Sequence, residues 1–262
     1  MKYLELRDFG PWLLNRRFLH PKVKLPQYMR IIALSWILLF GSSFTQPIYN
    51  AATAKDESRP LSIVDELWGQ LQATEQPFEL PSKDVLELGV KGYLLLVDSE
   101  AIEEGKPLAV IDFSLPSSQK RLWIVDISNG TLIHNGYVAH GRNSGELMAQ
   151  SFSNRHSSYM SSLGFYRTAE TYQGKHGYSL RLDGLEKGFN DQARERAVVI
   201  HGADYAREDF IKQTGRLGRS LGCPALPTEE SKYLIDVVKE GALLFIFAED
   251  EDYLSQSNLI NA

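Results

Sequence analysis

The sequence predicts a mostly β domain with a few peripheral helices, arranged as a β-sandwich or a curled sheet of mixed α and β character. A short apolar run near the C-terminus, 242–248, predicts a buried strand, and the pair Asn129-Gly130 favours a tight hairpin. Three further runs are rich in branched residues and separated by turn material, as is typical of strands: 108–113, 122–127 and 131–138.

Helical patterns flank this strand-rich region. Apolar residues recur at helical spacing in 61–71, and Ser82 can cap a second helix that extends to about Asp98. Gly89 and Gly92 argue against the second helix, because an interior glycine costs about 1 kcal/mol relative to alanine. Another helix is expected after Thr228. We expect the first two helices to brace the main domain.

The segment 1–54 is expected to be an N-terminal extension and a signal peptide. Residues 1–30 carry seven basic and two acidic side chains, a net charge of +5, and residues 31–54 carry no charge. The apolar run IIALSWILLF is short for a membrane span, which needs about 20 apolar residues, and Ala52-Thr53-Ala54 fits a cleavage site. Met29 is a candidate true start. The alternative is a long basic region or an uncleaved anchor.

The remaining chain would be exported to the periplasm or cell envelope, with no stable membrane span after cleavage. Its net charge is −10, because the whole chain carries −5. A protein this acidic is a poor partner for nucleic acid. The expected organisation after residues 1–54 is a linker with bracing helices at 55–104, a main domain at 105–248 and an acidic tail at 249–262.

A cysteine and a histidine mark the candidate site. Cys223 is the only cysteine and lies between Gly222 and Pro224, whereas His201 follows the strand-like run 197–200. A lone thiol is a buried spectator, an intermolecular partner or a reactive group. A thiol and an imidazole at the edge of one sheet are the parts of a cysteine acyl-transfer site, because an imidazole can lower the thiol pKa from about 8.5 through an ion pair.

The neighbouring glycines have roles in such a site. The carbonyl of Gly202 can accept the second N–H of the His201 imidazole and fix its tautomer. Gly222 lets the backbone approach a substrate closely. The N–H of Cys223, together with a neighbouring amide, is a candidate oxyanion hole.

The motifs in this region resemble those of a known family. The pair His201-Gly202 and the segment RSLGC at 219–223 are similar to the HG…SHGC signature of YkuD-type L,D-transpeptidases. The resemblance covers about residues 105–248 and is strongest to a divergent branch of murein L,D-transpeptidase catalytic domains. Five blocks occur in the family's order: AHGRNSG (139–145), FSN (152–154), SSLGFY (161–166), GKHGYSLRLDGLE (174–186) and VVIHGADY (198–205).

This resemblance implies an L,D-transpeptidase fold in which Cys223 is the nucleophile, His201 the base and Gly202 the residue that orients the imidazole. The thiolate would attack the peptide bond between a diamino acid and the terminal D-alanine of a peptidoglycan stem peptide. An amine or water would then resolve the acyl-enzyme. No metal or other cofactor is implied, and carbapenem-type inhibitors are candidate ligands.

Leu221 departs from the family signature, which has histidine at this position, so substrate or rate is expected to differ. Arg219 is expected to hold a substrate carboxylate or its own loop, unless it is a solvated charge. Ser220 would hydrogen-bond near the thiolate or to its own backbone. Tyr205 and Tyr166 are candidates to line the substrate groove, with half-buried packing as the alternative.

Other classes of protein fit less well. Papain-like and NlpC-like peptidases place cysteine before histidine, the reverse of the order here. A sortase needs a downstream arginine in a strand, which ALLFIFA lacks. Zinc binding through His140, His176, His201 and Cys223 is disfavoured because no tight ligand spacing is present, and His140 and His176 are expected to be groove or loop residues. An L,D-carboxypeptidase and a non-catalytic envelope protein that binds wall peptides stay open as alternatives.

Overall fold

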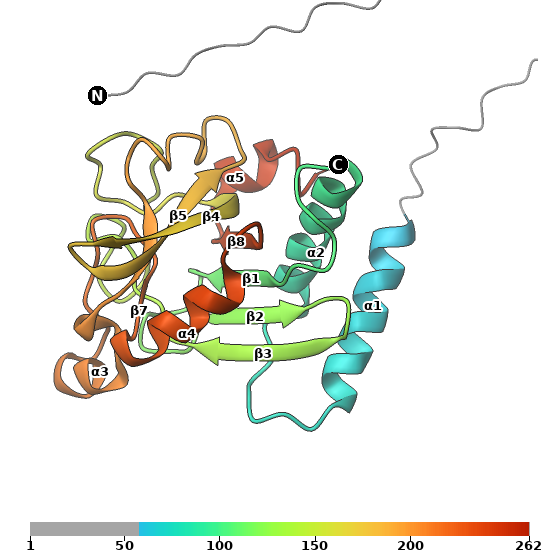
Figure 1. Cartoon of the computed structure of the whole chain (residues 1–262), viewed down its shortest axis with the longest axis horizontal. Coiled ribbons are helices and arrows are strands. Elements are labelled where there is room, and N and C mark those ends of the chain that lie inside the picture. The colour runs from blue at the N-terminus through green and yellow to red at the C-terminus, as the bar shows by residue number, and fades with distance from the viewer. Residues whose placement is uncertain (1–57, 262) are drawn as a thin grey trace, which may run out of the picture. The chain divides into compact units, whose positions relative to one another are not determined.

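A curled, eight-stranded mixed sheet is the centre of the computed structural model, which describes residues 58–261 (Figure 1). The strand order is β3-β2-β1-β8-β4-β5-β6-β7. The strands are β1 (Leu108–Asp112), β2 (Leu122–Asp126), β3 (Thr131–Gly136), β4 (Gly164–Gly174), β5 (Gly177–Gly184), β6 (Val199–Gly202), β7 (Ala225–Leu226) and β8 (Leu243–Phe247). The expected fold, mostly β with peripheral helices, is confirmed. The expected signal peptide lies outside the described residues.

Helices surround this sheet. They are α1 (Ser58–Ala73), α2 (Lys83–Asp98), the short 3₁₀ helix η2 (Asp204–Ala206), α3 (Glu208–Thr214), α4 (Thr228–Val238) and α5 (Glu251–Gln256). In Figure 1, α4 crosses in front of β1 and β2, and α1 and α2 stand beside them. None of the helices in the described part of the chain has the length and apolar character needed to cross a membrane.

Strand β8 joins two parts of the sheet that are distant in sequence. It pairs in parallel with β1, where Leu108 is opposite Leu243, and antiparallel with β4, where Gly164 is opposite Ile246. All five residues of β8 are buried, as the apolar sequence LLFIF predicts for a strand covered on both faces.

The hairpin between β2 and β3 is also confirmed. The two strands are antiparallel, and Gly130 in the connecting turn has a φ of 60°, which glycine adopts without steric cost. The Asn129 N–H donates to Asp126 Oδ1 at 3.0 Å and closes the turn. The Asn-Gly signal therefore marked the turn correctly.

The two glycines of α2 have a packing role. A Cβ at Gly92 would lie 2.1 Å from Cζ of Phe165, and a Cβ at Gly89 would lie 3.3 Å from side-chain atoms of Leu108 and Phe245. The absence of these side chains lets α2 approach β1, β4 and β8 closely. The close contact with the sheet offsets the helix-propensity cost that argued against α2.

The C-terminal segment differs from the acidic tail expected at 249–262. It contains α5, and Tyr253 of this helix is fully buried. The Tyr253 hydroxyl donates to Glu186 Oε2 at 3.0 Å, and the Ser257 hydroxyl donates to Glu186 Oε1. The Phe165 N–H also donates to this carboxylate, at 2.8 Å. The acidic composition of the segment concealed two residues that pair with a buried carboxylate.

Candidate active site

The fold brings His201 and Cys223 to adjoining strands, although they are well separated in sequence. Strand β6 contains His201, and β7 begins two residues after Cys223. The two strands are parallel, with His201 opposite Ala225, and the His201 N–H donates to Pro224 O at 3.4 Å. The strand expected at 197–200 starts two residues later, so His201 lies within it. Both side chains line one groove of about 450 Å³.

The His201 imidazole is oriented by the backbone. Its Nδ1 lies 2.9 Å from Gly202 O. Because a carbonyl oxygen only accepts, Nδ1 carries the proton and Nε2 is left with a lone pair. Burial lowers the pKa of His201, the hydrogen bond to Gly202 opposes this, and nearby His176 and Lys175 lower it further. The ring is therefore neutral at pH 7 and able to accept a proton through Nε2.

The half-buried Cys223 lines the groove, and its Sγ donates to Ala197 O at 3.8 Å. Burial raises the pKa of Cys223, while the N–H of Val199 and the charges of Arg196 and Lys175 act in the opposite direction. The raised thiol pKa and the lowered imidazole pKa both favour a neutral pair at rest. The ion pair expected from the sequence is therefore not the resting state that this geometry favours.

Gly222 and Ser220 shape the backbone before the thiol. Gly222 has a φ of +120°, a conformation that L side chains rarely adopt, and a Cβ there would lie 2.7 Å from Met160 O. The Ser220 hydroxyl donates to Cys223 O at 2.6 Å and accepts the Gly222 N–H at 3.0 Å. Of the two roles expected for Ser220, the structure shows the bond to its own backbone.

Arg219 holds a loop. Its Nη1 donates to Arg142 O at 3.1 Å, to Gly145 O at 3.2 Å and to Glu146 Oε1 at 2.6 Å. These contacts fit the second role expected for Arg219, that of fixing the loops beside the groove. The carboxylate of Glu146 also compensates its charge.

The side walls of the groove include Tyr205, while Leu221 lies at its rim with 52% of its surface exposed. Burial raises the pKa of Tyr205 to about 12, so its hydroxyl stays protonated. Tyr166, the other aromatic candidate, is fully buried and its hydroxyl donates to Ser162 O at 2.9 Å. Tyr166 is therefore part of the core and does not line the groove.

The two other histidines considered from the sequence have different positions. His176 lines the groove and stacks on His201, with ring centroids 4.4 Å apart. His140 is fully buried, which corrects the expectation that it is a groove or loop residue. The Arg121 guanidinium donates to His140 Nδ1 at 2.7 Å, and burial lowers the pKa of His140 to about 4. His140 is thus a neutral acceptor in the interior.

The sequence did not single out Arg196 or Lys175, which also line the groove. Nothing local in the sequence shows that the long side chain of Arg196 reaches across to another loop. Within residues 58–261, no group of three or more His, Cys, Asp or Glu side chains is arranged to hold a metal ion.

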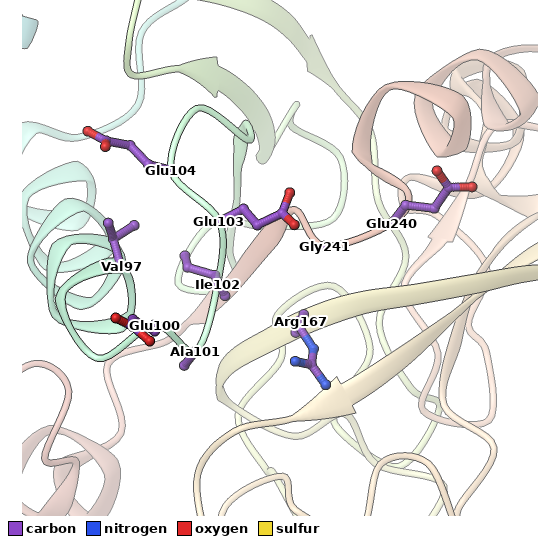
Figure 2. A pocket seen from close by; sticks show the side chains of 9 residues that line it. All are labelled: Val97, Glu100, Ala101, Ile102, Glu103, Glu104, Arg167, Glu240 and Gly241. Atoms are coloured by element: carbon purple, nitrogen blue, oxygen red, sulfur yellow. The ribbon is translucent and has the colours of Figure 1, made fainter. Parts of the chain in front are cut away.

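A second hollow, of about 600 Å³, lies elsewhere on the molecule (Figure 2). Its lining includes four carboxylates, Glu100, Glu103 and Glu104 after α2 and Glu240 before β8, together with Arg167 from β4 and apolar residues such as Val97 and Ile102. It is larger than the groove, but neither the thiol nor a histidine lines it. The smaller groove, which brings the thiol and His201 together, is therefore the candidate active site.

The arrangement of thiol, oriented imidazole and groove at the edge of a curled sheet is suited to acyl transfer through sulfur. A family model described as the L,D-transpeptidase catalytic domain matches residues 79–247. This is more than half of the chain, so the chain belongs to that family. The family that the sequence motifs indicated is confirmed, and the matched region includes α2.

The chain also resembles solved structures at low identity. An L,D-transpeptidase from Mycobacterium smegmatis is 13% identical over 55% of this chain and 59% of that one, with a TM-score of 0.34. The helical cell shape determining protein Pgp2 from Campylobacter jejuni is 12% identical over 57% and 50%, with a TM-score of 0.36. LdtMt1, in complex with imipenem, is 13% identical over 54% and 58%, with a TM-score of 0.33.

These matches span between half and three fifths of the length of the solved proteins. A comparison with curated proteins finds no match. The family assignment therefore depends on the match to the family model.

Proposed function

We propose that this protein is a peptidoglycan L,D-transpeptidase that acts through a cysteinyl acyl-enzyme. The observation that carries the proposal is the shared groove of Cys223 and His201, in which the Gly202 carbonyl fixes the imidazole with Nε2 free to accept a proton. Membership of the L,D-transpeptidase catalytic domain family supplies the substrate class.

The reaction begins with a proton transfer from Cys223 Sγ to His201 Nε2. The thiolate attacks the carbonyl carbon of the bond that precedes the terminal D-alanine of a stem peptide. The C–N bond breaks, His201 gives its proton to the leaving amine, and D-alanine departs. A side-chain amine of a second stem then attacks the thioester left on Cys223. The amine gives a proton to His201 Nε2 as the new amide bond forms, the C–S bond breaks, and the same proton passes to Sγ to regenerate the thiol.

The negative oxygen that forms during each attack needs hydrogen-bond donors. The Cys223 N–H is our candidate donor, because Gly222 before it has no side chain to keep the substrate away. Lys175 adds an exposed basic side chain to the lining of the groove. Such a side chain is suited to the carboxylates of stem peptides.

A water molecule in place of the second amine would make the protein an L,D-carboxypeptidase with the same acyl-enzyme. A protein that binds stem peptides without turnover would make no thioester. Export of the chain, proposed from the basic and apolar pattern of residues 1–54, would bring the groove to the cell wall. N-terminal sequencing of the exported protein would refute the proposed cleavage if residues before Ala52 are found.

The proposal is tested with a carbapenem and with a muropeptide that carries a tetrapeptide stem. Intact mass should show a carbapenem adduct that is absent in Cys223→Ala, and the muropeptide should release D-alanine. A cross-linked product identifies the transpeptidase, and a shortened stem alone identifies the carboxypeptidase. Binding without adduct or D-alanine would refute both and favour the non-catalytic protein.

His201→Ala tests the base. We expect acylation to slow by about 100-fold or more, the usual contribution of a general base. His156→Ala is the matched control, because His156 also lines the groove but is not among the residues that orient the thiol. A His201→Ala protein as fast as His156→Ala would refute the proposed pair.

A further inference from the structure

Arg196 extends from the loop before β6 to the 153–162 loop. Its Nη1 donates to Ser153 O at 2.8 Å and to Ser162 Oγ at 2.7 Å. Its Nη2 donates to Met160 O at 2.7 Å and to Ser158 Oγ at 3.3 Å. One guanidinium thus ties the 153–162 loop to the strand that carries the candidate base.

All four of these acceptors are neutral. A half-buried arginine is usually compensated by a carboxylate, because a charge removed from water without a counter-charge is costly. Burial lowers the pKa of Arg196, and the charges that oppose this within the described chain are the anionic forms of Tyr166 and Cys223. Tyr166 is fully buried, which raises its pKa and keeps it neutral. Cys223 is therefore the group that can supply the missing negative charge.

The guanidinium also lies next to the residue before the thiol. A Cβ at Gly222 would be 3.4 Å from Arg196 Nη2, and Arg196 and Cys223 line the same groove. Leu221, on the other side of Gly222, is apolar and exposed, so it offers no charge to the sulfur.

We propose that Arg196 is a positioning residue that acts as the fixed counter-charge of the Cys223 thiolate. The arginine keeps all of its protons. The proton of the thiol moves from Sγ to His201 Nε2, and the new negative charge forms beside a cation that is already held in place by its four hydrogen bonds. Because no dipole has to reorient as the charge appears, the thiolate is stabilised at the moment of attack.

Other groups that share the groove also affect the sulfur. Lys175 favours the thiolate, whereas the raised pKa of Tyr205 keeps that hydroxyl neutral. The titratable and charged side chains that line the groove with Cys223 and Arg196 are His156, Tyr159, Tyr172, Lys175, His176, His201, Tyr205 and Arg219. Among them Arg219 pairs with Glu146, and Lys175 lies in the exposed turn between β4 and β5.

The inference rests on the proposed role of Cys223 as nucleophile, and alkylation of the thiol tests it without any turnover. The pH dependence of the iodoacetamide reaction, followed by intact mass, gives the thiol pKa of the sole cysteine. Arg196→Gln should raise this pKa by about one unit and slow alkylation at pH 7 by about tenfold. Arg196→Lys keeps the charge but loses most of the hydrogen bonds, and should stay within about half a unit of the original protein.

Arg194→Gln is the matched control. It removes the same charge two residues away, but Arg194 is exposed and paired with Glu170 and Asp183. We expect no change in the thiol pKa. If the thiol pKa increases equally in Arg196→Gln and Arg196→Lys, Arg196 only ties the loops together. If the thiol pKa is unchanged in both variants, Arg196 has no role in stabilising the thiolate. Either result overturns the proposal. If Arg196→Gln does not fold, the lysine variant decides, because an increase of about one unit there overturns it.

The muropeptide assay keeps this inference apart from the proposed function. A protein with no D-alanine release but an Arg196-dependent thiol pKa would refute the transpeptidase and leave the counter-charge standing. If the Arg196→Gln variant releases D-alanine at the original rate and has an unchanged thiol pKa, the counter-charge role is refuted and the transpeptidase proposal stands.

Discussion

Replacing Gly222 with alanine should distort the loop that presents the thiol. The residue has a φ of +120°, and backbone strain of this kind costs about 1–3 kcal/mol when a side chain is added. The new Cβ would also lie 2.7 Å from Met160 O, a backbone atom that Arg196 holds, and overpacking of this kind costs about 1–3 kcal/mol. We expect a loss of about 2–6 kcal/mol in the free energy of unfolding, unless the loop shifts.

A shift of the loop would move Cys223 relative to His201, and a displacement of about 1 Å costs about 100-fold in rate. Urea unfolding and the rate of carbapenem acylation together measure both outcomes. Gly215→Ala is the control, because Gly215 has a φ of +80° but open space where its Cβ would lie. Its expected cost is only about 1–2 kcal/mol, with unchanged acylation. If Gly222→Ala matches Gly215→Ala in both stability and acylation rate, the close contact with Met160 does not matter and the reasoning fails.

Two further predictions concern the resting thiol and the packing of α2. The pKa of Cys223 is raised and that of His201 is lowered, so the thiol should be protonated at neutral pH. The rate of thiol alkylation should therefore keep increasing as the pH rises above about 8.5, the pKa of a free cysteine. A rate that is constant between about pH 5 and 7 would instead indicate an ion pair. Gly92→Ala should destabilise the protein by about 1–3 kcal/mol in urea unfolding, because the new Cβ overlaps Phe165. Gly69→Ala, on the open face of α1, should stabilise the protein by up to about 1 kcal/mol. Equal effects of the two substitutions would contradict the close packing of α2.

Local patterns were enough to predict the regular elements with a hydrophobic signature. The strands β1, β2 and β3, the hairpin turn at Gly130 and the stripe of α1 all follow from periodicity or turn chemistry. Helix α5 was missed because its evidence is not local. Buried Tyr253 is hydrogen-bonded to Glu186, which is far from it in sequence, and an acidic segment without this partner resembles a solvated tail.

The sequence indicated the candidate site where one residue type would carry the chemistry. Cys223 is the sole thiol, and His201 follows a buried run that ends at the edge of the sheet. The contacts of Arg196 were hidden, because its acceptors are carbonyls and hydroxyls of a distant upstream loop, which no spacing rule connects to it. The neutral resting state also required the structure, because it depends on how deeply both groups are buried.

The position of β8 has a consequence for the order of folding. Apart from isolated bridges such as that between Ala139 and Ala225, the described sheet without β8 consists of two parts, β3-β2-β1 and β4-β5-β6-β7, because β8 is the strand that pairs with both. The pairing of β1 with β8 joins the first strand of the sheet to the last, and such long-range closure slows folding. The first part can form as a local meander, but the two parts become one sheet only after α4 has been made and β8 has inserted between them. Chains that end before Leu243 should therefore lack the central pairing between these parts and be open to proteolysis there.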